Sequence, residues 1–136
     1  MENCVFCKIV KGDIPSYKVY EDNYTYAFMD IANDVDGHIL VIPKNHVVNV
    51  LDSDNETLHH VLDTVKLISN KLVENCGYDG VNVLNASGEA ANQTVFHLHF
   101  HIIPKRKSDS FTAWPKLPGG SGVESVYKKI MENFNK

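Results

Sequence analysis

Hydrophobic and polar residues alternate along residues 95–104, and this alternation is the clearest structural signal in the chain. Successive side chains of a β-strand point to opposite faces, so residues two apart share a face and are spaced by about 6–7 Å. Residues 95–104 are therefore predicted to form a strand with one apolar face and one face of histidines. The apolar face comprises Phe96, Leu98, Phe100 and Ile102, and the other face comprises His97, His99 and His101.

Four further strands are predicted ahead of this one. Extended runs at 17–20 and 24–29 flank a short polar turn, and the apolar run 38–43 is typical of a buried strand that ends at a proline. Residues 81–85 predict another strand. The small and polar residues 86–94 follow it, and we expect them to form a loop that folds back over the histidine face.

Helical periodicity predicts three helices. A capping-box spacing at residues 53–56 marks the start of the longest helix, and a glycine at the end of residues 76–77 marks its end. A short helix is predicted at residues 5–10, and a second capping box at residues 121–124 predicts a C-terminal helix. The core-facing stripe of the longest helix comprises Leu58, Val61, Leu62, Val65, Ile68 and Leu72.

These elements together predict an α+β fold, an antiparallel sheet of about five strands with one long helix packed on it. The chain has 136 residues, of which 43% are hydrophobic, and this fits a single domain over residues 1–136. Its net charge of −4, with both signs interspersed, argues against a nucleic-acid partner. Without a visible signal peptide or a run of ~20 apolar residues, we expect a cytoplasmic protein with no membrane partner.

Three imidazoles on one strand face predict chemistry. A purely structural strand gains nothing from histidines where threonine or valine has better β-propensity. Imidazoles titrate near neutral pH and can attack, donate protons or bind metal. The strand spacing suits one phosphate better than one metal ion, which weakens the interpretation that His97, His99 and His101 together bind a metal.

A second candidate site lies at the N-terminus, where Cys4 and Cys7 form a C-x-x-C motif. A redox pair would open a helix after a strand, and no strand can precede Cys4. Two thiolates and two imidazoles, with His46 and His97 as the available histidines, would make a closed tetrahedral zinc site. Spacing alone leaves this interpretation and a pair of partly buried thiols both open.

The segment 97–103 resembles the signature of the histidine triad (HIT) superfamily, in which three histidines alternate with apolar residues. The flanking segments 28–31 and 37–44 are similar as well, as are Asn85 and residues 93–95. The resemblance covers about residues 4–107, which leaves 108–136 as a C-terminal tail and helix. Within the superfamily, the chain most resembles the bacterial Hit branch, which is similar to Hint-type nucleotide-binding proteins.

This resemblance implies a metal site and a mechanism. Cys4, Cys7, His46 and His97 would hold one structural Zn²⁺ per chain. His99 would attack the α-phosphate of a bound nucleotide, and water would release a nucleoside monophosphate from the nucleotidyl-histidine. A carbonyl on its other ring nitrogen would orient the attacking lone pair, and burial would keep the ring neutral.

The resemblance also implies the ligands and partners. The expected substrates are purine nucleoside phosphoramidates, such as adenylylated amines, and the expected assembly is a homodimer. Residues 93–95 also resemble the Fhit-type branch, so a dinucleoside polyphosphate hydrolase is the alternative, and a nucleotide-binding adaptor with little catalysis is a third. The expected substrate-binding residues are Phe28, Asp30, Ile31, Asn85, Gln93, Thr94, Val95 and His101.

Within that set, Phe28 and Ile31 would line the purine pocket and Asp30 would bind the ribose hydroxyls, whereas the remaining polar groups would donate to phosphoryl oxygens. Without the resemblance, Asp30 would be taken as a turn or cap residue. Asn92 replaces a glycine common in the family, and asparagine is among the residues that best tolerate positive φ. Trp114 would either close a partner's pocket or pack on the sheet.

Overall fold

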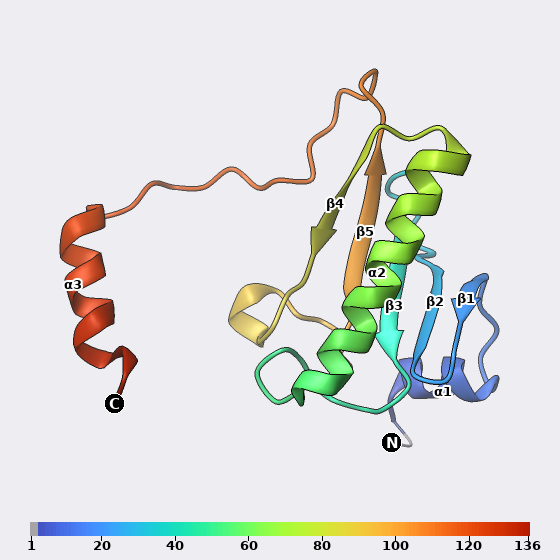
Figure 1. Cartoon of the computed structure of the whole chain (residues 1–136), viewed down its shortest axis with the longest axis horizontal. Coiled ribbons are helices and arrows are strands. Elements are labelled where there is room, and N and C mark those ends of the chain that lie inside the picture. The colour runs from blue at the N-terminus through green and yellow to red at the C-terminus, as the bar shows by residue number, and fades with distance from the viewer. Residues whose placement is uncertain (1–2) are drawn as a thin grey trace.

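The computed structural model describes residues 3–136, which form a five-stranded antiparallel sheet in the order β1-β2-β3-β5-β4 with three α-helices (Figure 1). This confirms the predicted α+β fold. The elements are α1 (Val5–Lys11), β1 (Lys18–Glu21), β2 (Thr25–Met29), β3 (Ile39–Pro43), α2 (Asn55–Cys76), β4 (Gly80–Leu84), the 3₁₀ helix η1 (Glu89–Ala91), β5 (Phe100–Lys105) and α3 (Val123–Phe134). Among the described residues, no helix combines the length and the apolar content needed to cross a membrane.

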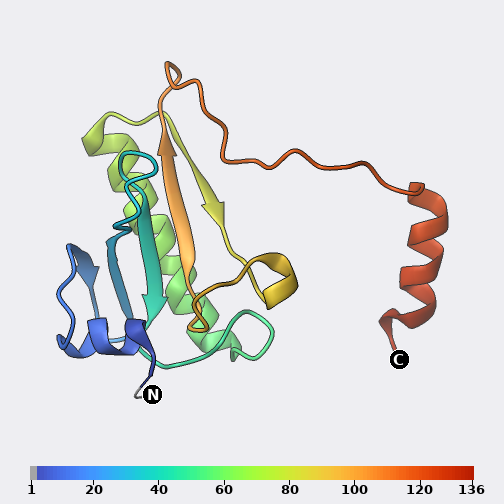
Figure 2. The same cartoon turned by 180° about the vertical axis from the view of Figure 1, so that it is seen from behind.

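Strand β3 is the centre of the sheet and is buried on both faces. Ile39 and Val41 pack in the cluster with α2, whereas Leu40 and Ile42 pack in the cluster with α1. The two helices lie on opposite faces of the sheet (Figure 2). This explains why its sequence is a continuous apolar run, because a strand covered on both sides has no polar face. The long helix therefore supports the sheet from one side, and the N-terminal helix covers part of the other.

Helix α2 begins one residue later than the capping-box spacing predicted. Its N-cap is Asp54, whose carboxylate accepts from the Thr57 N–H at 3.1 Å and from the Thr57 hydroxyl at 2.7 Å. The hydroxyl of Ser53 instead donates to the Asp54 carbonyl. Gly77 ends the helix in the left-handed conformation, as predicted. Leu62 was wrongly placed on the core-facing stripe, since it is exposed.

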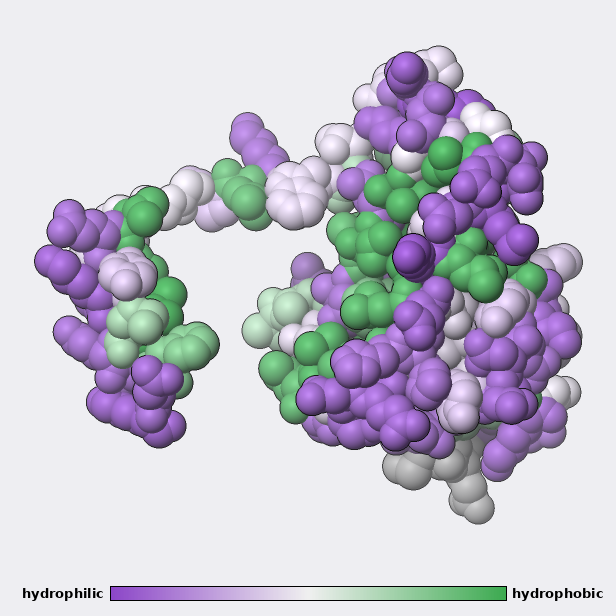
Figure 3. All heavy atoms as spheres, viewed as in Figure 1, coloured by the Kyte–Doolittle hydropathy of each residue, from purple (hydrophilic) through white to green (hydrophobic). Residues whose placement is uncertain are grey.

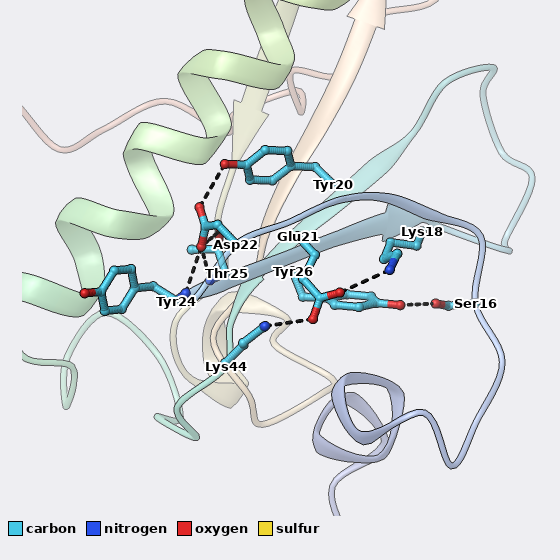
Figure 4. A network of polar contacts seen from close by, with 9 residues as sticks. All are labelled: Ser16, Lys18, Tyr20, Glu21, Asp22, Tyr24, Thr25, Tyr26 and Lys44. Atoms are coloured by element: carbon cyan, nitrogen blue, oxygen red, sulfur yellow. Dashed lines mark hydrogen bonds and ion pairs between the residues drawn. The ribbon is translucent and has the colours of Figure 1, made fainter.

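The β1–β2 turn is held by the carboxylate of Asp22 (Figure 4). One of its oxygens accepts from the backbone N–H groups of Tyr24 and Thr25, both at 2.8 Å. Beside it, Glu21 pairs with Lys44 at 2.7 Å, which ties the end of β1 to the residue directly after β3. These contacts fix the direction in which the chain leaves β3 toward His46.

The predicted histidine strand is shorter than expected, because regular pairing starts only at Phe100. The N–H of Leu98 donates to the carbonyl of Val47 at 2.8 Å, so this part of the chain is held by the segment after β3 and lies outside the sheet ladder. Leu98 and Ile102 are fully buried against α2, as the alternation predicted. Phe96 is half exposed, and its assignment to the apolar core face was wrong.

Helix α3 forms where it was predicted but lies apart from the rest of the molecule at the end of an extended segment (Figure 1). The capping box at Ser121 does not form, since the N-cap is Gly122 and makes no side-chain hydrogen bond to the helix. Trp114 in the extended segment is 64% exposed, so it does not pack on the sheet. Figure 3 shows hydrophobic side chains along α3 that remain uncovered.

Candidate functional site

Four side chains at the junction of α1 and the histidine segment form a candidate metal centre. The ligand atoms of Cys4, Cys7, His46 and His97 all lie within 4.8 Å of one another. The Nδ1 atoms of the two histidines are 3.2 Å apart, and the Cys4 and Cys7 sulfurs lie 3.3 and 3.4 Å from the Nδ1 atoms of His97 and His46. Zinc bonds of about 2.0–2.3 Å in a tetrahedron require ligand separations of roughly 3.3–3.8 Å. The quartet therefore fits zinc.

The surroundings of His97 prepare it to be a metal ligand. Its Nε2–H donates to the Pro43 carbonyl at 2.8 Å, which leaves the lone pair of Nδ1 directed at the cysteine sulfurs. Burial lowers the pKa of His97 to about 4, so the ring is neutral at physiological pH. Burial also raises the pKa of the Cys7 thiol, and a bound cation would be needed to stabilise the thiolate there.

His99 has the orientation expected of a nucleophile. Its Nδ1–H donates to the His97 carbonyl at 2.8 Å, and its Nε2 is left free at a pocket. Burial lowers the pKa of His99, although the bond to His97 and the charge of Asp30 oppose that shift. Both expectations for this residue, the carbonyl on one nitrogen and the effect of burial, are confirmed.

The pocket beside His99 has a volume of about 300 Å³ and is lined mainly by apolar side chains. Phe6 from α1 packs edge-on against His99, with ring centroids 5.2 Å apart, and against Phe28 at 5.5 Å. Phe6 was missed from the sequence. The sequence could have indicated this position. Phe6 lies between Cys4 and Cys7, and a metal site that these cysteines share with His97 brings Phe6 close to the histidines.

The structure brings Phe28, Asp30 and Ile31 to the wall of this pocket. Phe28 is buried, whereas Ile31 is 83% exposed and lies at the rim. Oδ1 of Asp30 accepts from the Ala32 N–H at 2.8 Å, so Asp30 also stabilises a turn, and its Oδ2 lies 3.6 Å from Nε2 of His38. Thr94 and Val95 line the same pocket.

The side-chain amide of Gln93 makes four hydrogen bonds that hold the segments beside the pocket. Both N–H groups of its amide are used by backbone carbonyls, at 2.6 Å from Val48 and 3.1 Å from Val95. Its oxygen accepts from Asn49 and from the Gly88 N–H. Donation from Gln93 to a phosphate would require one of these bonds to break, so the geometry gives this residue a positioning role.

Asn85 and Asn92 shape the same loop. The amide of Asn85 donates to the His99 carbonyl at 2.9 Å and holds the nucleophile's backbone. Asn92 ends the short helix η1 with φ of 71°, which is the positive φ that its place in the sequence predicted. Neither side chain lines the pocket beside His99.

The third histidine of the row has a partner that the sequence did not reveal. Nδ1 of His101 lies 2.9 Å from Nε2 of His38, and Nδ1 of His38 lies 2.8 Å from an oxygen of Asp34. Burial, together with the charges of His99 and His38, lowers the pKa of His101 to about 4. The sequence feature that could have indicated this partner is His38 itself, a histidine at the start of a buried apolar strand.

Comparisons with known proteins agree with this geometry. A protein-family model described as "HIT domain" matches residues 11–108. The chain is 48% identical over 113 residues to the Bacillus subtilis protein called "Protein hit", covering 82% of this chain and 78% of that protein. It is 43% identical over 114 residues to an adenosine 5′-monophosphoramidase of Saccharomyces cerevisiae, covering 82% and 70% respectively. A crystal structure of a zinc-bound histidine triad family protein from Mycobacterium smegmatis has a TM-score of 0.78 at 38% identity, covering 87% and 85%.

Proposed function

Because the chain belongs to the HIT family, we propose that it is a hydrolase that cleaves purine nucleoside phosphoramidates at the α-phosphate. The observation that carries the proposal is His99, whose Nδ1–H is held by the His97 carbonyl while Nε2 faces the pocket. The yeast relative named for adenosine 5′-monophosphoramidase activity supports the choice of substrate.

In the proposed reaction Nε2 of His99 attacks the α-phosphorus and the phosphorus–nitrogen bond breaks. The electron pair of that bond goes to the amine nitrogen, which takes up a proton as it leaves. Water then attacks the nucleotidyl-histidine, releases the nucleoside monophosphate and restores His99. Thr94 and His101, on the pocket wall, are the side chains proposed to donate to the phosphoryl oxygens.

Different walls of the pocket would bind the base, the ribose and the phosphate of the nucleotide. The apolar side formed by Phe6, Phe28 and Leu40 is suited to a flat purine ring, with Ile31 at the rim. Asp30 lines the same pocket, and its carboxylate would accept hydrogen bonds from the ribose hydroxyls. The α-phosphate would then lie against His99 and His101.

The test is a panel of adenosine and guanosine phosphoramidates and dinucleoside polyphosphates with rapid-quench mass spectrometry. We expect a nucleotidyl adduct on His99, and a fall in kcat/KM of about a thousandfold or more in His99→Ala. His59→Ala is the matched control, because His59 is exposed on α2. A preference for dinucleoside polyphosphates, or tight monophosphate binding without turnover, would replace the proposal by one of its alternatives.

We also propose one structural Zn²⁺ per chain, held by Cys4, Cys7, His46 and His97. The tetrahedral separations of the ligand atoms and the zinc-bound relative support this. The metal would join α1 to the histidine segment and take no part in the reaction, because the quartet leaves no open coordination position for substrate.

A homodimer is proposed as the assembly. The support within the chain is α3, which lies away from its own body and leaves a row of apolar side chains exposed (Figure 3). A second copy would give this row a surface on which to pack. A cytoplasmic location stays a prediction from the sequence.

A further inference from the structure

His38 is a buried histidine for which the proposed reaction has no use. It is 5% exposed and lies between two carboxylates and the third histidine of the row. Its Nδ1 is 2.8 Å from Oδ1 of Asp34, and its Nε2 is 2.9 Å from Nδ1 of His101 and 3.6 Å from Oδ2 of Asp30. Both ring nitrogens are therefore engaged, which is the arrangement of a proton relay and exceeds what packing requires.

The hydrogen bonds restrict the proton positions to two states. An ionised carboxylate only accepts, so Nδ1 of His38 carries a hydrogen directed at Asp34. Nε2 of His38 then either accepts from the Nδ1–H of His101 or, when it is protonated, donates to the bare Nδ1 of His101. In the first state Nε2 of His101 has no hydrogen, and in the second it has one. The two states differ by a single proton, and both keep every hydrogen bond.

We propose that Asp34 is a positioning residue that acts through His38 to set whether His101 can give a proton to the departing amine. The proposal rests on the proposed function and adds to it a residue outside the histidine triad. In this chain of contacts His101 touches the substrate, whereas His38 and Asp34 act only through it.

The proton transfer balances in both halves of the reaction. When the phosphorus–nitrogen bond breaks, the amine nitrogen takes the hydrogen from Nε2 of His101. Nδ1 of His101 takes the hydrogen from Nε2 of His38, which becomes neutral and keeps its bond to Asp34. When water attacks the nucleotidyl-histidine, its proton passes to Nε2 of His101 and the sequence runs in reverse.

The charges around His38 favour this path of proton transfer from His38 to His101. A positive charge on His38 would lie beside Asp34 and near Asp30, whereas His101 is held neutral by burial and by the neighbouring charges of His99 and His38. The hydrogen bond to His38 lowers the pKa of Asp34, which stays ionised at neutral pH. The two carboxylates thus lie on the His38 side of the pair, whereas the substrate lies on the His101 side, so a proton passed to the amine moves from His38 through His101.

A purely structural role for Asp34 is the competing explanation. Its side chain is 53% exposed, and Oδ1 also accepts from the Val35 N–H at 2.9 Å, so it stabilises the loop before β3. A structural role would affect all substrates alike. A proton-positioning role affects only substrates whose leaving group needs a proton.

The experiment compares two adenosine substrates in the full-length chain, an alkylamine phosphoramidate and a nitrophenyl ester of adenosine monophosphate. Amines require protonation to leave, whereas nitrophenolate leaves as an anion. In Asp34→Asn we expect kcat for the phosphoramidate to fall about tenfold with KM and the nitrophenyl rate unchanged. Asp36→Asn, an exposed residue of the same loop, is the matched control. Equal losses on both substrates, or no loss on either, would overturn the proposal.

A second readout does not depend on turnover. Nitrogen NMR of the histidine rings at neutral pH should show a hydrogen on Nδ1 of His38 in the wild type. In Asp34→Ala, where the acceptor is gone, the spectrum should show a mixture of His38 tautomers. An unchanged His38 spectrum overturns the proposal. If the wild type cleaves neither substrate but the spectrum changes as expected, the proposed function fails and the link between Asp34 and His38 stands.

Discussion

At the scale of single residues, the site depends on which nitrogen of each histidine carries a hydrogen. The Pro43 carbonyl holds Nε2 of His97 and the His97 carbonyl holds Nδ1 of His99. His97 therefore presents Nδ1 to the cysteines, whereas His99, two residues later, presents Nε2 to the pocket. Sequence spacing predicted the row of rings. The tautomers follow from backbone carbonyls that only the folded chain brings close.

Burial of His101 predicts a specific loss of stability in acid. Its pKa is about 4 in the folded chain and near the ordinary 6.5 when unfolded, so the unfolded state binds the proton more strongly. This loss is absent above pH 6.5 and grows as the pH falls from 6.5 toward 4. It amounts to at most about 2 kcal/mol between pH 7 and pH 5. Urea denaturation at the two pH values should show a smaller fall in the free energy of unfolding for His101→Gln than for the wild type. Equal falls would contradict the prediction.

Substitutions at Gln93 and at its neighbour Thr94 should affect different properties, the first the stability of the fold and the second the activity. Gln93→Leu leaves the part-buried Val48 and Val95 carbonyls without the donors of Gln93 and should lower the free energy of unfolding by about 1–3 kcal/mol. Thr94→Ala removes an exposed hydroxyl at the pocket and should reduce kcat while changing stability by less than about 0.5 kcal/mol. Chemical denaturation and steady-state kinetics on both variants check this. A stable Gln93→Leu protein would argue that the loop has other anchors.

At the scale of elements, helix α1 is joined to the histidine segment by the candidate metal centre and by Phe6. Neither connection is local in sequence. The pattern of α1 predicted a short helix, and only the C-x-x-C motif together with the resemblance placed it against His97. His38 and His101 illustrate the remaining gap, because they are 63 residues apart and their contact leaves no periodic trace in the sequence.

Removing one cysteine should separate the metal centre from the nucleophile. We expect Cys4→Ser to lose its zinc and to melt at a markedly lower temperature, because the binding energy of a structural metal is part of the folding energy. Metal analysis by mass spectrometry and thermal unfolding give the measurement. Cys76→Ser is the matched control, since Cys76 is exposed at the end of α2. His99→Ala should keep one zinc per chain, and loss of zinc in that variant would count against the assigned ligands.

At the scale of the whole molecule, the segment from residue 114 through α3 is the part that its own chain leaves exposed throughout. Capping rules failed at both helices for a local reason, since Asp54 and Gly122 each took the position expected of a serine. The amphipathic pattern of α3 nevertheless predicted a helix correctly. What local pattern could not predict is where that helix lies, because it is joined to the sheet only through an extended segment (Figure 1).

The proposed dimer should depend on the apolar side of α3. Val126→Asp combined with Ile130→Asp introduces two charges on that side, and we expect the mass measured by light scattering to shift from dimer to monomer at micromolar concentration. Lys128→Glu with Lys129→Glu alters two exposed lysines of the same helix and is the control. A dimer that survives the aspartates would place the interface elsewhere.

Strand β3, buried on both faces, has a consequence for how the protein folds. It pairs with β2 just before it, and also with β5, where Ile39 meets Ile102 across the whole length of α2 and β4. Contacts between residues far apart in the chain form late, because the loop between them must close first. We therefore expect β5 to join β1–β3 late, together with β4, which pairs with β5 at the edge of the sheet. Since His99 directly precedes β5 and His101 lies within it, the reactive centre would come into being at the closing step of folding, and no partly folded intermediate would carry it.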